Sequence, residues 1–214
     1  LYYAITVFFK PMEADLGWSR SQMTGAFSLS LLIAGVAGVP VGRLLDRHGP
    51  RWIMTAGSIG ATLLVLAWSR VDSLTAFYLI WAGIGLVAAT VLYEPAFVAV
   101  ANWFARHRSK ALTALTFGGG FASVIFIPLS AWLVDAYGWR AALVVLALIL
   151  GAVTIPLHAF ALRRRPADLG LEIDGGPAEA IDNAQPVSPV WRGVPADSAL
   201  RHSSFWWIAI GFFL

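Results

Sequence analysis

Five long runs without a charged residue set the strongest limit on how this chain folds. They hold 22, 18, 21, 24 and 22 residues and cover 21–42, 52–69, 73–93, 111–134 and 141–162. A helix needs roughly 20 residues to cross a hydrocarbon core of about 30 Å. Barrel strands alternate apolar and polar residues over about 10 positions, whereas these runs are apolar on every side. The sequence therefore predicts an all-α, polytopic membrane protein.

Composition supports the same conclusion. Only 13% of the residues are charged, 58% are hydrophobic and the mean hydropathy is +0.72, whereas soluble domains contain about 25% charged residues. A soluble enzyme is therefore excluded as the default interpretation. The chain has no cysteine, which rules out a disulfide framework.

Two shorter uncharged runs lie at the two ends, over residues 1–9 and 203–214. Neither is long enough to cross a bilayer. A short amphipathic anchor is the alternative, but residues 205–210, Phe-Trp-Trp-Ile-Ala-Ile, have no polar face. We expect two membrane helices cut at the ends of the sequence, and therefore a fragment of a longer protein.

The runs and the charges between them predict the organisation of the chain. We expect helices over about 1–9, 19–44, 51–69, 74–104, 109–134 and 140–162. Residues 163–204 contain five prolines and few aromatic residues, so they cannot bury a core of their own. This predicts a transmembrane bundle over 1–162, with its first helix truncated and the next five complete, a linker over 163–204, and the start of a seventh helix over 205–214.

The distribution of Lys and Arg predicts the orientation in the membrane. If the first helix runs outward, eleven of the fifteen Lys and Arg residues lie in inside segments and four lie outside. Positive charges resist translocation, so we expect the N-terminus and the linker to lie in the cytoplasm. The sequence pI of 9.6 then reflects this cytoplasmic lining and does not indicate a nucleic-acid partner.

An internal repeat relates the two halves of the bundle. Asp46, Gly49 and Arg51 match Asp135, Gly138 and Arg140 at an offset of 89 residues, and the same offset superimposes the surrounding helices. Three helices is an odd number, so the two copies lie on opposite sides of the membrane, the second on the outside. An inverted repeat of three helices is typical of secondary transporters, whose sites lie near the midplane.

The first copy of this motif carries a family resemblance. The segment Gly42-Arg43-Leu44-Leu45-Asp46-Arg47-His48-Gly49-Pro50-Arg51 resembles the signature Gly-x-Leu-x-Asp-Arg-x-Gly-Arg-Arg/Lys of the major facilitator superfamily, with Pro50 in place of a basic residue. The resemblance implies a six-helix half of a twelve-helix fold, and covers the chain as the amino-terminal half.

Other segments are similar to one branch of that superfamily, the monocarboxylate transporters and oxalate/formate antiporters. They include Phe8-Phe9-Lys10-Pro11-Met12, Tyr93-Glu94-Pro95-Ala96-Phe97 and Gly138-Trp139-Arg140. The branch implies a small organic anion as substrate. We expect an integral protein of a bacterial inner membrane.

The resemblance also implies a gating role for the first motif. Its residues would latch the two halves of the carrier on the inside and separate when the cavity opens inward, which is a bistable element and not a binding site. The alternative is that the arginines only set the topology. The implied gating residues are Gly42, Arg43, Asp46, Arg47, Gly49 and Arg51, with Asp135, Gly138 and Arg140 as the external copy.

Glu94 is the only charged residue in the predicted helix over 74–104, about 10 residues from its cytoplasmic end. A charge at this depth costs several kcal/mol in lipid, so it should face a cavity or a partner. Glu94 either carries a coupling proton, or is a protonated or paired carboxyl that only fixes helix packing. Tyr93, Tyr2 and Tyr3 are further substrate candidates through their hydroxyl groups, with aromatic packing as the alternative.

The sequence predicts a transporter and not an enzyme. It contains no Gly-rich phosphate loop, and its His spacing suggests no metal site, so we expect no cofactor. The predicted function is secondary transport of a small organic anion by alternating access, with proton symport or anion exchange. No Lys or Arg lies inside the complete runs, so the cation for an anion would come from the missing C-terminal half. The alternatives are a proton-driven exporter of cationic compounds and a membrane receptor without transport.

Overall fold

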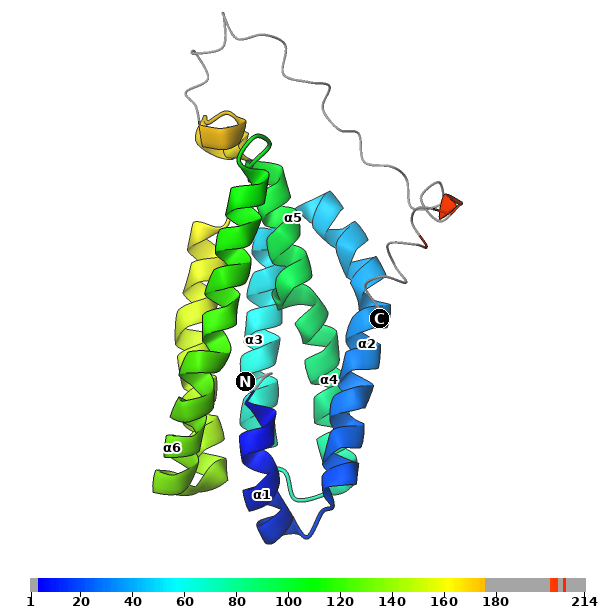
Figure 1. Ribbon diagram of the computed structural model, residues 1–214, viewed down its shortest axis with the longest axis vertical. Coiled ribbons are helices and arrows are strands. Elements are labelled where there is room, and N and C mark those ends of the chain that lie inside the picture. Colours follow the sequence, from blue (N-terminus) through cyan, green and yellow to red (C-terminus); the bar gives the residue numbers. More distant parts are fainter. Residues whose placement is uncertain (1–3, 176–200, 204–205, 207–214) are drawn as a thin grey trace, which may run out of the picture. The chain divides into compact units, whose positions relative to one another are not determined.

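The computed structural model describes residues 4–175, 201–203 and 206, and divides the chain into two units, 1–178 and 179–214. The first unit is a bundle of helices (Figure 1). Its elements are α1 (Ile5–Leu16), α2 (Arg20–His48), α3 (Pro50–Trp68), α4 (Leu74–Val91), α5 (Tyr93–Trp103) and α6 (Arg108–Pro156), followed by the short helices η1 (Leu157–Ala161), η2 (Pro166–Leu169) and η3 (Ile173–Gly175).

The longest helix, α6, is two antiparallel limbs. Gly138 interrupts it with φ 78° and ψ 163°, a left-handed conformation that favours glycine, and the chain reverses there (Figure 1). Residues 108–137 and 139–156 therefore correspond to two of the predicted helices. In the described part of the chain, four segments are long and apolar enough to span a membrane: 20–48, 50–68, 74–103 and the two-limbed 108–161. This confirms the predicted all-α membrane fold.

The first helix extends further than the sequence predicts. The predicted end is near Phe9, whereas the helix continues to Leu16. Gly17 caps it in a left-handed conformation and donates its backbone N–H to the carbonyl of Glu13. Phe8 and Met12 are fully buried, four residues apart on one face, while the charged residues lie on the exposed side. A search for uncharged runs misses a helix end of this amphipathic kind.

The predicted helix over 74–104 is broken into α4 and α5. Leu92 separates them with φ −82° and ψ −149°. The cause lies three residues further on, because Pro95 donates no backbone hydrogen bond and its ring would clash with the carbonyl of Val91 in a continuous helix. The break places Glu94 in the first turn of a new helix.

Close helix crossings hold the bundle together. A Cβ added to Gly85 of α4 would overlap the backbone carbonyl of Ser30 in α2, and one added to Gly57 of α3 would overlap Thr90 of α4. Small residues at such crossings let backbones approach, which is how membrane helices gain packing energy without a hydrophobic drive.

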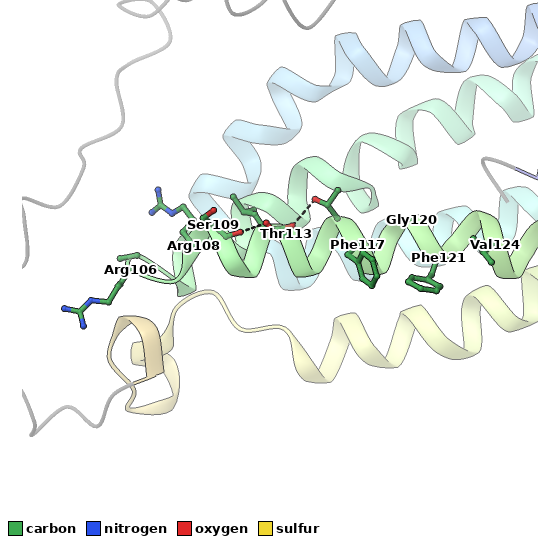
Figure 2. Close-up of a pocket in the computed structure, with 11 residues that line it drawn as sticks. Arg106, Arg108, Ser109, Thr113, Phe117, Gly120, Phe121 and Val124 are labelled. Carbon is green, nitrogen blue, oxygen red and sulfur yellow. Dashed lines mark hydrogen bonds between the residues drawn. The ribbon is translucent and has the colours of Figure 1, made fainter.

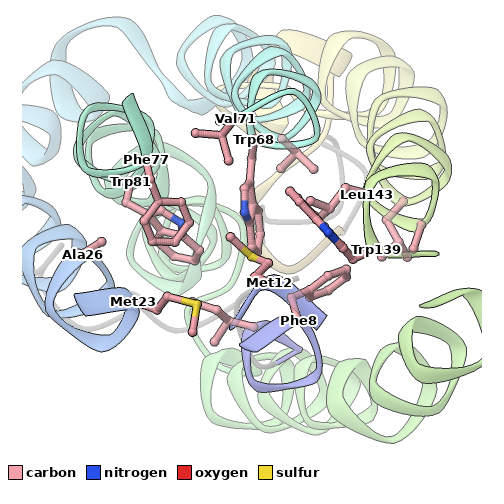
Figure 3. Packing of buried hydrophobic residues seen from close by; sticks show 14 of the residues in the cluster. Phe8, Met12, Met23, Ala26, Trp68, Val71, Phe77, Trp81, Trp139 and Leu143 are labelled. Carbon is pink, nitrogen blue, oxygen red and sulfur yellow. The ribbon is translucent and has the colours of Figure 1, made fainter. Parts of the chain in front are cut away.

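Aromatic side chains fill the core at the end of the bundle where α1 terminates. The rings of Trp68 and Trp81 lie 5.1 Å apart in an edge-to-face arrangement, and Phe8 lies 5.3 Å from Trp68. Phe77 packs against both indoles (Figure 3). Such pairs contribute about 0.5–1.5 kcal/mol each beyond the area they bury, so they fix α1, α3 and α4 together.

The crossing of α2 and α4 makes a direct test of this packing. Gly85→Ala should lower the free energy of unfolding by about 1–3 kcal/mol, because the added methyl group forces the two backbones apart. Thermal unfolding in detergent measures the effect. The matched control is Gly38→Ala in α2, where nothing lies within 4 Å of an added Cβ. Equal melting temperatures for the two variants would contradict the close crossing.

Candidate gating and substrate-binding sites

The two copies of the repeated motif form the same kind of turn. Gly49 joins α2 to α3 with φ 78° and ψ 169°, and Gly138 joins the two limbs of α6 with φ 78° and ψ 163°. The two turns lie at opposite ends of the bundle, here named the Gly49 face and the Gly138 face (Figure 1). The same backbone conformation at the same repeat position, at opposite ends, agrees with the inverted repeat predicted from the sequence.

On the Gly49 face, the motif is bound to the segment that follows α6. The Nε of Arg51 donates a hydrogen bond of 2.6 Å to the carbonyl of Ala159, and its guanidinium lies 4.9 Å from the ring centroid of Trp52. Arg164 donates to the backbone carbonyl of Asp46 at 3.0 Å, and its side chain occupies the space where Gly49 has no Cβ. Arg51 therefore makes its bond within the bundle.

The other predicted gating residues face outward. Arg43, Asp46 and Arg47 are exposed, and none of their side chains has a hydrogen bond or ion pair within the described residues. Gly42 is half-buried, with nothing within 4 Å of an added Cβ. Of the four charged residues of the predicted gating motif, Arg51 is thus hydrogen-bonded within the bundle and the other three are exposed. Their gating role stays a prediction.

On the Gly138 face, Arg140 is bonded to the end of α3. Its Nη1 donates to the carbonyls of Ser69 and Val71 at 3.2 and 3.1 Å. Its Nη2 lies 2.7 Å from the carboxylate of Asp72 and 3.5 Å from that of Asp15. Arg140 therefore joins three elements at one end of the bundle.

Two neighbours complete this network. The indole N–H of Trp139 donates to Asp15 at 3.1 Å, and the guanidinium of Arg140 lies 4.3 Å from the ring centroid of Trp139. Asp135, the counterpart of Asp46, is exposed and has no partner within the described residues.

Asp15 and Asp72 were not identified from the sequence as partners of Arg140. Their only signal was that each lies in a short polar stretch beside a predicted helix end.

The predicted substrate residues separate in space. Glu94 is exposed in the first turn of α5. Tyr93, its neighbour, lines a cavity inside the bundle, and its hydroxyl approaches Gly119 of α6. Tyr2 and Tyr3 lie outside the described residues.

The cavity that Tyr93 lines, here named the interior cavity, is partly open and has a volume of about 650 Å³. It is lined by Ala4 and by residues of α3, α4, α5 and both limbs of α6. Its lining contains no charged side chain. It includes Trp68 and Trp81, whose indole nitrogens are buried and have no hydrogen-bond partner in the described part. Burying an unpaired charge is costly, so this cavity is a poor site for an anion.

A second, open groove of about 990 Å³ follows the outer side of the first limb of α6 (Figure 2). Arg106 and Arg108 lie at one end, and Phe117, Phe121 and Val124 continue along the limb with exposed fractions of 70%, 46% and 65%. The hydroxyls of Thr113 and Thr116 donate to their own helix. An exposed apolar stripe of this kind is covered by lipid or by further protein.

One cation lies on the exposed side of α1. Lys10 belongs to the helix, because α1 continues six residues past it. Thr6 lies one turn earlier on the same exposed side. Among the described residues Lys10 has no hydrogen bond or ion pair, and the nearby carboxylate of Glu13 pairs with Arg20 at 3.4 Å.

The beginning of the predicted linker is bound to the bundle. The Asp174 carboxylate accepts the backbone N–H groups of Ala105, Arg106 and His107 at 3.1, 2.9 and 3.2 Å. These bonds, led by that from Arg106, hold the pKa of Asp174 below its ordinary value of 3.8. Three consecutive N–H groups aimed at one anion form a backbone nest, so η3 is fastened to the loop before α6.

Within the described residues, no three His, Asp or Glu side chains gather as metal ligands do.

Comparison with known proteins identifies the family. The family model described as Major Facilitator Superfamily matches residues 1–214. The chain belongs to this superfamily.

The chain is similar to curated proteins that are named as transporters. It is 33% identical over 191 residues to monocarboxylate transporter 13 of Bos taurus, covering 87% of this chain and 43% of that protein. It is 29% identical to the oxalate:formate antiporter of Oxalobacter formigenes, with coverages of 75% and 38%, and 29% identical to the uncharacterized MFS-type transporter YcxA of Bacillus subtilis, with 74% and 39%. The chain thus spans less than half the length of these relatives.

The backbone nest around Asp174 can be tested by proteolysis of this superfamily member. Asp174→Asn should speed trypsin cleavage at Arg163 and Arg164, because the neutral amide holds the three N–H groups less strongly than the carboxylate. Glu172→Gln removes the same charge two residues away and should leave the rate unchanged.

The pH dependence of the native contact follows from the lowered pKa of Asp174. A carboxylate with a lowered pKa contributes its stabilisation above its ordinary value and loses it as the pH falls through the lowered one. The contact should therefore persist from neutral pH down to about pH 4. Hydrogen exchange at the backbone N–H groups of residues 105–107 measures it over this range, where trypsin loses its own activity. Equal cleavage rates for Asp174→Asn and the native chain at neutral pH would contradict the contact.

Proposed function

We propose that this chain is the N-terminal half of a secondary active transporter that moves a small, monocarboxylate-like organic anion by alternating access, with proton symport or anion exchange. The observation that carries the proposal is similarity along most of the chain to proteins named monocarboxylate transporter and oxalate:formate antiporter. The other half of the binding site would come from a C-terminal half of the same protein.

The proposed orientation has the Gly49 face in the cytoplasm, together with the N-terminus and the linker. Eleven of the fifteen Lys and Arg residues then lie on the inside, in agreement with the positive-inside rule. The proposed location is a bacterial inner membrane. Arg43, Asp46 and Arg47 on this face are exposed and without partners in the described residues, so they are free to latch against the second half when the carrier faces outward.

The position of Glu94 supports a substrate path along the surface of this half. Glu94 is exposed within a membrane-spanning segment, where a charge facing lipid costs several kcal/mol. It must therefore be covered by protein or by a water-filled path. Because the interior cavity has no charged lining residue, we place the path between this half and its partner half, with Glu94 as the carrier of the coupling proton.

Lys10 is our candidate for a cation that attracts the anion. It lies in α1, on the exposed side, and about five residues, or roughly 7 Å of helical rise, from Asp15 at the Gly138 face. An anion entering from that face would meet this charge before reaching Glu94. A deeper cation would come from the C-terminal half.

The exposed carboxylate of Glu94 also favours a second candidate, a proton-driven exporter of cationic compounds, in which Glu94 would be the counter-charge. Uptake of radiolabelled small carboxylates into proteoliposomes separates the two. Saturable carboxylate uptake supports the anion carrier, and flux of lipophilic cations without carboxylate uptake supports the exporter. Binding of a ligand without any flux would instead indicate a receptor.

If Glu94 carries the coupling proton, replacing it should remove the pH dependence of transport. Glu94→Gln should abolish the pH dependence of carboxylate uptake, because the amide cannot exchange a proton. The measurement is the uptake rate between pH 5.5 and 8. Glu13→Gln, which alters an acid at the end of α1 outside the membrane-spanning segments, is the control and should keep the native profile. An unchanged profile in Glu94→Gln with normal expression rejects the proton role.

The role of Lys10 predicts a change in KM. Lys10→Ala should raise the KM for an anionic substrate by ~2–5-fold, the range of a partly exposed ion pair, and Lys10→Arg should restore it because the charge is kept. Lys110→Ala, at the Gly49 face, should leave the KM for uptake from the opposite side unchanged. A native KM in Lys10→Ala would show that the anion does not pass this side chain.

A further inference from the structure

The bonds of Arg51 and Arg140 are related to each other by the internal repeat. Arg51 belongs to the first three-helix repeat and donates to Ala159 in the second. Arg140 belongs to the second repeat and donates to Ser69 and Val71 in the first. With the offset of 89 residues, Ala159 corresponds to position 70, which lies between these two acceptors. The two contacts are therefore reciprocal, as two-fold symmetry requires of a contact between equivalent units.

Both arginines bind the same kind of group. Ser69 is the first and Val71 the third residue after α3, and Ala159 lies in η1, directly after α6. The last carbonyls of a helix have no partner inside it, and a cation is favoured there by the helix dipole. Each arginine thus caps the third helix of the other repeat, at opposite faces of the bundle.

We propose that Arg51 and Arg140 are a symmetry-related pair of positioning residues that clamp the two repeats to each other, so that the six helices move as one rigid body during transport. Arg51 then forms a hydrogen bond within this half and takes no part in the latch between the halves. That latch is formed by Arg43, Asp46 and Arg47. The rigid-body role rests on the proposed alternating access. The clamp itself does not depend on the substrate.

The test measures distances between spin labels placed on the two repeats of the intact protein in lipid. One label pair, His48→Cys with Lys110→Cys, reports on the Gly49 face. The other, Thr24→Cys with Tyr137→Cys, reports on the Gly138 face. All four positions are exposed, and this chain has no native cysteine.

The clamp predicts a face-specific effect. Arg51→Ala should broaden the distance distribution of the first pair and leave the second narrow, and Arg140→Ala should do the reverse. The controls are Arg106→Ala and Arg70→Ala, which remove exposed cations at the same two faces and should leave both distributions narrow. Where Arg51→Ala does not accumulate, Arg51→Lys keeps the charge and loses the guanidinium geometry, and the first pair should still broaden.

Three results overturn the proposal. They are narrow distributions in all variants, equal broadening of both label pairs in either variant, and the same broadening in the alanine controls. The readout needs no flux, so it separates failure of the clamp from failure of the transport function. Face-specific broadening without carboxylate uptake would support the clamp and contradict the proposed substrate.

Discussion

Backbone polar groups inside a bilayer have to be satisfied by the protein, because hydrocarbon offers them no partner. Helices meet this requirement along their length but leave their last carbonyls open. At the two faces of this bundle, Arg140 donates to carbonyls that follow α3 and Arg51 to one that follows α6, and each arginine is supplied by the other repeat. The turns at Gly49 and Gly138, with the same left-handed conformation, bring the arginines to those positions. A short motif that occurs twice therefore supplies a bond between the two repeats at each face.

Much of the fold was predictable from the sequence, because transmembrane length and the absence of charge are properties of single segments. The two limbs of α6 follow from the uncharged runs 111–134 and 141–162, and the turn at Gly138 between them follows from the repeat. The extension of α1 to Leu16 was not predictable in this way, since Met12 is its only buried residue beyond Phe9 and the charged residues lie on the exposed side. The break at Leu92 was not predicted either, because the proline that causes it, Pro95, lies almost one turn further along the chain.

Less of the candidate site was predictable, because it depends on contacts far apart in the chain. The motif predicted that Arg51 is important but not that its partner is the carbonyl of Ala159. Asp174 lies in a stretch with the composition of a loose linker, yet it occupies a nest of three backbone N–H groups. Glu94 and Tyr93 are adjacent in sequence and lie in different surroundings, one exposed and one at an interior cavity.

We propose that the two copies of the motif lie on opposite sides of the membrane, with Gly49 inside. The most direct measurement is labelling of single cysteines in intact cells with a membrane-impermeant maleimide, using His48→Cys and Tyr137→Cys, which are both exposed. The account predicts that position 137 is labelled in intact cells and position 48 only after permeabilisation. Labelling of both positions from the same side would contradict the inverted repeat, and the reverse pattern would contradict the proposed orientation.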